Sequence, residues 1–401
     1  MSDSDGFPWE IGVHDAHCHP TDTMASIAGI PEMKATTLTV MATRGQDQDL
    51  VLQAAQSINS QAPEGPDRII PCFGWHPWFS HQIIDDTTGE AKTEGQKEAH
   101  YSSVLVIPAD DTDFAEFVKH LPEPKPLSSL IAETRERLKQ FPKALVGEVG
   151  LDKRFKLPGP WTAQQLDGRD EQITPGSREG RKLSPYKVKI DHQRAILKAQ
   201  LQLAGEMRRA VSVHSVQAHG TVFDALKELW AGHERVVLSR RARGRNQDAE
   251  GAISAEKEDS DGKGQASSTK GSEGGANAIG TRSAEACQQE LLPFPPRICM
   301  HSYSGPPDQL RQFMAKTNPS DVYFSFSSLI NFTGAHARKV GDVIKALPED
   351  RILIESDLHT AGPEMDDLLE DVARQVCGLR EWELRSGVQK LADNWKRFVY
   401  G

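Results

Sequence analysis

The chain has 401 residues, of which 37% are hydrophobic, and its formal net charge is −10 at pH 7. This charge argues against passive, salt-driven binding to a polyanion, although an enzyme can still act on phosphates through metal ions and a local basic rim. The low hydrophobic content indicates an ordinary core diluted by polar insertions.

Cysteine usage and the apolar runs restrict the class of protein further. The five cysteines show neither CxxC spacing nor an even framework, which argues against a disulfide-stapled secreted protein. Residues 1–10 lack a signal-peptide pattern, and the longest apolar runs are too short to span a bilayer. We therefore expect a soluble, reduced protein in the cytoplasm, the nucleus or both.

Eight segments have the β-branched and apolar composition of strands. The first ends at His17-Cys18-His19, and the others are residues 35–42, 68–74, 144–150, 210–215, 297–301, 321–329 and 351–354. Helices are predicted over residues 47–58, 127–140, 187–209, 220–230 and 381–400. Alternating strands and helices favour an α/β fold with a parallel sheet, and eight such units suggest a (β/α)8 TIM barrel. In that fold the functional residues lie at the C-terminal strand ends.

Three polar segments interrupt this pattern. Residues 80–101 are patternless, and residues 155–184 mix Pro, Gly and charge without a period. Residues 239–290 are dominated by small and polar residues and have no aromatic residue, so they cannot bury enough apolar surface to offset the entropy of ordering. We therefore predict one barrel domain over residues 1–401 with three insertions, the last of them disordered.

Candidate metal ligands stand at six predicted strand ends. They are His17 and His19, His76, Glu148, His214, His301 and Asp357. Residues i and i+2 of a strand face the same side, so His17 and His19 can bind one ion. Glu148 and Asp357 follow apolar strand residues, where an unpaired charge is costly and a metal ion removes that cost. Imidazole and carboxylate ligands without thiolate suit Zn²⁺ or Mn²⁺. The structural alternatives are packed histidines and a salt-bridged carboxylate at the barrel rim.

Four motifs occur in a characteristic order. They are His17-Cys18-His19 after Asp15, Gly74-Trp75-His76-Pro77, Gly147-Glu148-Val149-Gly150-Leu151-Asp152 and Glu355-Ser356-Asp357. Together they resemble the motifs of the TatD family, metal-dependent hydrolases of the amidohydrolase superfamily, and residues 393–398 are similar to the family's closing segment. The long insertions and Leu358-His359 resemble a fungal branch of that family. That branch is named for interaction with a TPR subunit of the anaphase-promoting complex, which implies a protein partner of that kind.

The resemblance implies two divalent metal ions (Zn²⁺, Mn²⁺ or Mg²⁺). The implied ligands are His17, His19 and Asp357 for the first ion, His214 and His301 for the second, and Glu148 as a bridge between them. His76 resembles the family histidine that faces the substrate phosphate. Leu358-His359-Thr360 replaces a small residue, Pro and an aromatic residue that are common in the family, so the substrate stays open. His359 is either a substrate contact or an exposed loop residue.

The predicted function is hydrolysis of a phosphodiester, such as the 3′-end of DNA or RNA, by a two-metal-activated water. In this hypothesis Asp357 takes the proton of the attacking water, and His76 offsets charge on the phosphoryl oxygens. Trp75 and Trp78 either stack on nucleobases or pack at the barrel rim. Two alternatives stay open: hydrolysis of another ester or amide, such as an aminoacyl ester on tRNA, and a barrel that acts as a protein-binding adaptor.

Overall fold

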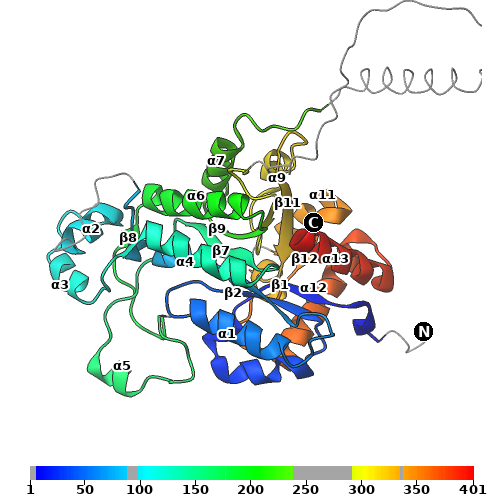
Figure 1. Cartoon of the computed structure of the whole chain (residues 1–401), viewed down its shortest axis with the longest axis horizontal. Coiled ribbons are helices and arrows are strands. Elements are labelled where there is room, and N and C mark those ends of the chain that lie inside the picture. Colours follow the sequence, from blue (N-terminus) through cyan, green and yellow to red (C-terminus); the bar gives the residue numbers. More distant parts are fainter. Residues whose placement is uncertain (1–5, 88–96, 177, 238–290, 335–336) are drawn as a thin grey trace, which may run out of the picture. The chain divides into compact units, whose positions relative to one another are not determined.

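Eight parallel strands form one sheet in the computed structural model, which describes residues 6–87, 97–176, 178–237, 291–334 and 337–401 (Figure 1). In sheet order these strands are β1 (His14–Cys18), β2 (Thr37–Met41), β3 (Ile69–Phe73), β7 (Leu145–Asp152), β9 (Val211–Val216), β10 (Arg297–Met300), β11 (Asp321–Phe326) and β12 (Ile352–Ile354). Each predicted strand overlaps one of these eight. The predicted disordered segment, residues 239–290, lies outside the described residues.

Backbone hydrogen bonds just beyond β1 and β12 bring the two ends of the sheet together. The Asp357 N–H donates to the His17 carbonyl (3.0 Å), and the His19 N–H donates to the Leu358 carbonyl (2.7 Å). The Asp15 carboxylate also accepts the Ser356 N–H at 3.1 Å. The sheet is therefore a nearly closed ring, and the predicted (β/α)8 TIM barrel is confirmed.

Helices surround the sheet. They include α1 (Gln48–Asn59), α4 (Leu127–Gln140), α6 (Ile190–Glu206), α7 (His219–Trp230), α9 (Pro307–Phe313), α11 (Ala337–Ala346), α12 (Pro363–Arg380) and α13 (Leu384–Tyr400). The helix predicted over residues 187–209 is shorter at both ends. Its first residues form β8 (Lys187–Val188) instead, which pairs antiparallel with β5 (Leu105–Val106). Among the described helices, none combines the length and apolarity needed to cross a membrane.

The inward faces of the strands carry a buried apolar layer, which we call the lower layer. It consists of Ala16, Met41, Ile70, Cys72, Leu145, Ala210, Cys299, Tyr323 and Leu353, with Trp395, Phe398 and Val399 of α13. Neighbouring strand residues such as Leu38 and Val40 point the other way, into the larger cluster beneath the helices. The Trp395 indole N–H donates to Thr39 Oγ1 at 3.0 Å, so α13 is tied to the barrel interior. This packing leaves the carboxyl ends of the strands for polar residues.

A smaller hydrophobic cluster lies beside the barrel, between α2 (Lys97–Val104), α3 (Phe114–Lys119) and β8 (Figure 1). We call it the satellite cluster; its buried members are Tyr101, Val104, Leu105, Phe114, Phe117, Val118, Leu157, Tyr186 and Val188. The sequence indicated no pattern over residues 80–101, yet α2 begins at Lys97 and buries Tyr101. The last residues of that segment are therefore helical.

Candidate metal centre

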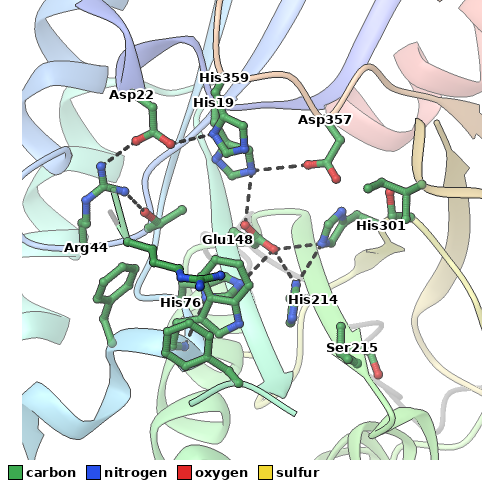
Figure 2. A pocket seen from close by; sticks show the side chains of 18 of the residues that line it. His19, Asp22, Arg44, His76, Glu148, His214, Ser215, His301, Asp357 and His359 are labelled. Atoms are coloured by element: carbon green, nitrogen blue, oxygen red, sulfur yellow. Dashed lines mark hydrogen bonds and ion pairs between the residues drawn. The ribbon is translucent and has the colours of Figure 1, made fainter. Parts of the chain in front are cut away.

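Glu148 lies at the centre of a cluster of histidines at the carboxyl ends of the strands (Figure 2). Its Oε1 lies 2.9 Å from Nδ1 of His214 and 2.8 Å from Nε2 of His301. Its Oε2 lies 3.5 Å from Nε2 of His17 and 3.4 Å from Nε2 of His19. The two oxygens of one carboxylate therefore face two different pairs of imidazoles.

An irregularity in β7 directs Glu148 to this position. Strict alternation from Val146, which packs outward, would send Glu148 outward as well. The pairing register with β9 shifts between Val146 and Val149, and a bulge of this kind re-aims a side chain. Gly150 then passes very close to β9, because a Cβ at this position would lie 2.0 Å from the His214 carbonyl oxygen. The glycine is thus required for the two strands to present Glu148 and His214 side by side.

Each pair of imidazoles has the spacing of ligands that share one ion. The Nε2 atoms of His17 and His19 lie 3.1 Å apart, and Asp357 Oδ1 lies 3.6 Å from Nε2 of His19. Nδ1 of His214 lies 3.3 Å from Nε2 of His301. Two nitrogens on one tetrahedral zinc ion, with bonds of about 2.0–2.1 Å, lie about 3.3 Å apart. The ligand atoms of His17, His19 and Asp357 all lie within 4.8 Å of one another.

The outer nitrogens of these rings have partners of their own. Nδ1 of His17 lies 2.8 Å from Ser212 Oγ, and Nε2 of His214 lies 3.2 Å from Asp152 Oδ2. The Trp78 indole N–H donates to the same Asp152 oxygen at 2.7 Å. Metal-ligating histidines are commonly anchored in this way through the nitrogen that does not bind the ion. For His214, the Asp152 carboxylate favours a proton on Nε2 and leaves the Nδ1 lone pair facing Glu148.

The outer nitrogen of His301 faces Glu355, a carboxylate that stands in one of the four motifs but to which the sequence analysis gave no role. Nδ1 of His301 lies 3.6 Å from Oε1 of Glu355, a fully buried residue. The Ser302 N–H donates to this carboxylate at 2.8 Å, and the Ser325 hydroxyl donates to its other oxygen. These hydrogen bonds satisfy a carboxylate that would otherwise be costly to bury.

His76 is bonded differently from the other histidines. Its Nδ1 accepts the backbone N–H of Trp78 at 3.1 Å, so the proton of the neutral ring is on Nε2. That Nε2 points at Glu148 Oε1, 3.2 Å away. Burial lowers the pKa of His76 to about 4, which keeps the ring neutral at physiological pH. His76 is therefore a hydrogen-bond donor at this centre and has no lone pair to offer an ion, although its ligand atom lies close enough to be grouped with Glu148 and His214.

The surrounding imidazoles keep the two carboxylates of the cluster ionised. Burial would raise the pKa of Glu148, but the imidazoles of His76, His301 and His17 outweigh it and hold that pKa well below its ordinary value. Burial likewise opposes ionisation of Asp357, yet hydrogen bonding to His19 and the neighbouring imidazoles lower its pKa to about 2. Both carboxylates are thus ionised at neutral pH, as metal ligands must be.

A cavity of about 400 Å³ opens over the cluster, within the range of small-molecule sites. His19, His76, Glu148, His214, His301 and Asp357 all line it, and His17 lies buried directly beneath. Trp78 lines the cavity and stacks on Phe155 with ring centroids 4.6 Å apart. Trp75 is buried, and its indole N–H donates to the Phe79 carbonyl. Of the two tryptophans, only Trp78 is therefore placed to meet a ligand.

His359 lies at the rim of the same cavity. Its Nδ1 lies 2.7 Å from Asp22 Oδ2, and the other Asp22 oxygen accepts from Arg44 at 2.6 Å (Figure 2). The His359 ring also stacks on that of His19. The side chain is 64% exposed, so His359 is a loop residue that borders the cavity. Asp22 and Arg44 lie outside the four motifs, so the sequence contained no signal for them.

Comparisons with known proteins agree with this architecture. The sequence model of the family described as TatD related DNase matches residues 14–255 and 279–400. The Cut9-interacting protein scn1 of Schizosaccharomyces pombe is 33% identical over 387 residues, which cover 96% of this chain and 98% of that protein. An uncharacterized deoxyribonuclease of Saccharomyces cerevisiae, YMR262W, is 25% identical over 402 residues, with 96% and 98% covered.

The solved structures include an uncharacterized amidohydrolase from Saccharomyces cerevisiae. It superposes with a TM-score of 0.50 at 12% identity and covers 96% of this chain and 99% of that one, which supports the barrel fold. Because the family model spans most of the sequence and one relative is 33% identical along nearly its whole length, the chain belongs to the TatD family of metal-dependent hydrolases.

Proposed function

We propose that this protein hydrolyses phosphodiester bonds of nucleic acid with two divalent ions bound at the candidate metal centre. The first ion would be held by His17, His19 and Asp357, the second by His214 and His301, with Glu148 shared between them. The observation that carries the proposal is the position of Glu148, whose two oxygens face the two histidine pairs separately. A carboxylate in that position is a natural bridge for a two-metal site.

The donor set fits such ions. Each histidine pair has the nitrogen spacing of shared ligands, and Ser212 and Asp152 anchor the outer nitrogens of His17 and His214. The ligands are imidazole nitrogens and carboxylate oxygens without thiolate, a set that suits Zn²⁺ or Mn²⁺. When bound, the ions supply an activated water and offset charge on the phosphoryl group.

The chain's own side chains would move and hold protons around the reacting phosphate. Asp357 is ionised and borders the cavity, so its carboxylate is able to accept the proton of the attacking water. Its backbone has a φ of 57°, in the left-handed region, which a non-glycine residue seldom adopts outside a constrained position. His76 keeps its Nε2 proton and would donate it in a hydrogen bond to a phosphoryl oxygen.

The choice of nucleic acid rests on the relatives and on the cavity wall. One curated relative is named a deoxyribonuclease, and the family is described as TatD related DNase. Trp78 and Phe155 provide an aromatic wall on which a nucleobase would stack. An aminoacyl ester of tRNA would meet the same ions and is the competing substrate in the test.

A second role follows from the name of the other curated relative. The Schizosaccharomyces pombe protein is named for its interaction with Cut9. We propose that this chain also binds a protein partner of TPR type, in addition to its hydrolytic activity. Co-purification of wild type and a metal-ligand variant with such a partner would separate this role from catalysis.

The test of the hydrolytic function is elemental analysis of protein purified without chelator, followed by a substrate panel. Up to two divalent ions per chain are expected, and 3′-labelled DNA or RNA should be cleaved in a reaction that EDTA abolishes. His17→Ala combined with His19→Ala should empty the first site. Wild type with no metal above background would overturn the metal centre. Metal-dependent release of amino acid from aminoacyl-tRNA, with no cleavage of DNA or RNA, would replace the substrate class.

A further inference from the structure

The connection from β7 to α6, residues 153–189, differs in charge from the chain as a whole. It contains nine Lys and Arg against four Asp and Glu, a net charge of +5 in a chain of net charge −10. Six of these basic residues are exposed: Lys153, Arg154, Lys156, Arg178, Lys182 and Lys189. A local basic segment in an acidic protein indicates where an anionic ligand would approach. We refer to it as the β7–α6 connection.

Hydrogen bonds hold the β7–α6 connection against the loops that follow β1 and β2. The Thr174 N–H donates to the Asp22 carbonyl at 2.9 Å, and the Thr174 hydroxyl donates to the Thr21 carbonyl at 2.6 Å. Nε of Arg44 donates to the Pro175 carbonyl at 3.0 Å. The connection contributes Phe155, Pro158, Gly176 and Arg178 to the lining of the cavity over the metal centre. It therefore forms a fixed wall of that cavity.

Two arginines line the cavity among the described residues, and their charges are balanced differently. Arg44 is buried and forms ion pairs with Asp22 (2.6 Å) and Asp47 (3.4 Å), so its charge is already balanced within the cavity wall. Arg178 is exposed, and its Nε donates to the Arg181 carbonyl at 3.0 Å. Its terminal guanidinium nitrogens have no ion-pair partner in the part of the chain that the structure describes. The charge of Arg178 is thus available to a ligand in the cavity.

The chemistry of that ligand follows from the proposed function, on which this inference rests. A nucleic-acid strand that places one phosphate at the metal centre brings a neighbouring phosphate along with it. Among the described residues that line the cavity, Arg178 is the arginine without a carboxylate partner, so its charge can neutralise this second phosphate. A guanidinium binds phosphate through a planar fork of donors and stays charged at every physiological pH.

We infer that Arg178 forms a second phosphate subsite, which binds the phosphate next to the scissile one and so selects polynucleotides over esters with a single phosphate. The connection supplies both this cation and Phe155 of the aromatic wall. Arg178 acts in binding and positioning, because the residues assigned to proton transfer are Asp357 and His76.

The first measurement is binding. Fluorescence anisotropy of a short labelled single-stranded DNA should be recorded at several salt concentrations, on metal-loaded protein carrying Asp357→Asn to suppress cleavage. Adding Arg178→Ala should weaken binding about tenfold and reduce the slope of log Kd against log salt by about 0.7, the value for one phosphate contact on a single strand. Arg178→Lys should retain most of the slope. Lys182→Ala is the matched control, because it removes one charge from the same connection at an exposed position outside the cavity.

The second measurement is kinetic and uses otherwise wild-type enzyme. Arg178→Ala should lower kcat/KM for the oligonucleotide at least fivefold more than for the p-nitrophenyl ester of thymidine 5′-phosphate, which has one phosphate. Equal losses on both substrates, or a salt slope equal to that of Lys182→Ala, would overturn the subsite while leaving the proposed function intact. Binding that depends on Arg178, in a protein that cleaves neither DNA nor RNA, would overturn the proposed function and support the subsite.

Discussion

Ala210, directly before β9, packs in the lower layer, whereas His214 on β9 faces Glu148 at 2.9 Å only two inward positions further along the chain. Ser212 stands between them and contacts His17. At β10 a shorter step of one inward position leads from Cys299 in the lower layer to His301, which directly follows the strand in the metal centre. One or two inward positions, a rise of about 6.6–13 Å along a parallel strand, thus separate apolar packing from ionisable groups. The lower layer of the barrel interior therefore serves stability, and the layer above it serves chemistry. Variants in the lower layer should change the free energy of unfolding, and variants in the layer above should change turnover and metal binding.

Asp357→Asn tests the metal centre, which forms the upper layer of the barrel interior, and has the largest expected effect. Asparagine keeps the shape and one oxygen ligand but cannot accept a proton, and loss of a general base typically costs about 10²–10⁴ in rate. We expect kcat on a 3′-labelled oligonucleotide to fall at least about a hundredfold. The second ion should be retained, with part of the first.

The control for this variant is Asp393→Asn, which changes an exposed carboxylate on α13. It should leave both turnover and metal stoichiometry near the wild-type values. Near-wild-type turnover of Asp357→Asn would remove Asp357 from the mechanism.

Leu353→Ala tests the lower layer. Leu353 is 1% exposed and belongs to the lower layer on β12, so truncation leaves a cavity and should cost about 2–5 kcal/mol in the free energy of unfolding. Metal bound per folded chain should not change. Urea denaturation and elemental analysis of the same preparation measure both quantities. Leu183→Ala, at a position 46% exposed, is the matched control and should change the unfolding free energy by less than about 0.5 kcal/mol.

His76→Ala sharpens the comparison within the upper layer. Because its Nε2 carries a proton, His76 should not be needed for metal binding, and its loss should lower kcat by about 10², the cost of one transition-state hydrogen-bond donor. His301→Ala, by contrast, should lose an ion. A His76→Ala protein that has lost metal would contradict the tautomer and make His76 a ligand.

Two buried histidines outside the metal centre should make the free energy of unfolding depend on pH, and this effect is smaller than those above. Burial lowers the pKa of His192 to about 4 and that of His81 to about 3, so the folded protein holds both neutral. The unfolded chain binds more protons between pH 6.5 and about 4, so stability falls as pH falls through this window. Each of these two histidines should therefore lower the free energy of unfolding by about 2 kcal/mol when the pH falls to 5.

His192→Gln isolates one of these groups. The Gln amide retains a donor for the Ser80 carbonyl, which Nε2 of His192 approaches at 2.9 Å, but it does not titrate. The loss of unfolding free energy between pH 7 and pH 5 should therefore be smaller in the variant than in wild type. An equal loss would assign the acid sensitivity to other groups.

The sequence predicted the barrel and the ligand types because both depend on local signals. Each strand is a short apolar run, and each candidate ligand follows such a run within the chain. Parallel topology then brings residues as distant as His17 and Asp357 to one end of the barrel. No knowledge of side-chain packing is needed for that step.

Other features depend on contacts that no local pattern records. Strict alternation would send Glu148 outward, and only its register shift against β9 brings it inside. Glu355 is an acidic residue with no exposed surface. Its burial is explained by its contacts with Ser325 and His301, which the sequence does not reveal. The satellite cluster draws its members from separate short segments, none long enough to show a period.

The closure of the barrel between β1 and β12 has a consequence for how the protein is made. Asp15 and Ser356, which are hydrogen-bonded across the closure, stand 341 residues apart in sequence. An ion held by His17 and Asp357 would cross-link the first and the last strand of the barrel, and a nascent chain that does not yet reach Asp357 lacks one of the ligands. At a thousandfold excess over its Kd such an ion adds about 4 kcal/mol to the folded state. Only a chain synthesised past Asp357 would gain this stabilisation, so a product truncated before that residue would remain easier to unfold and degrade.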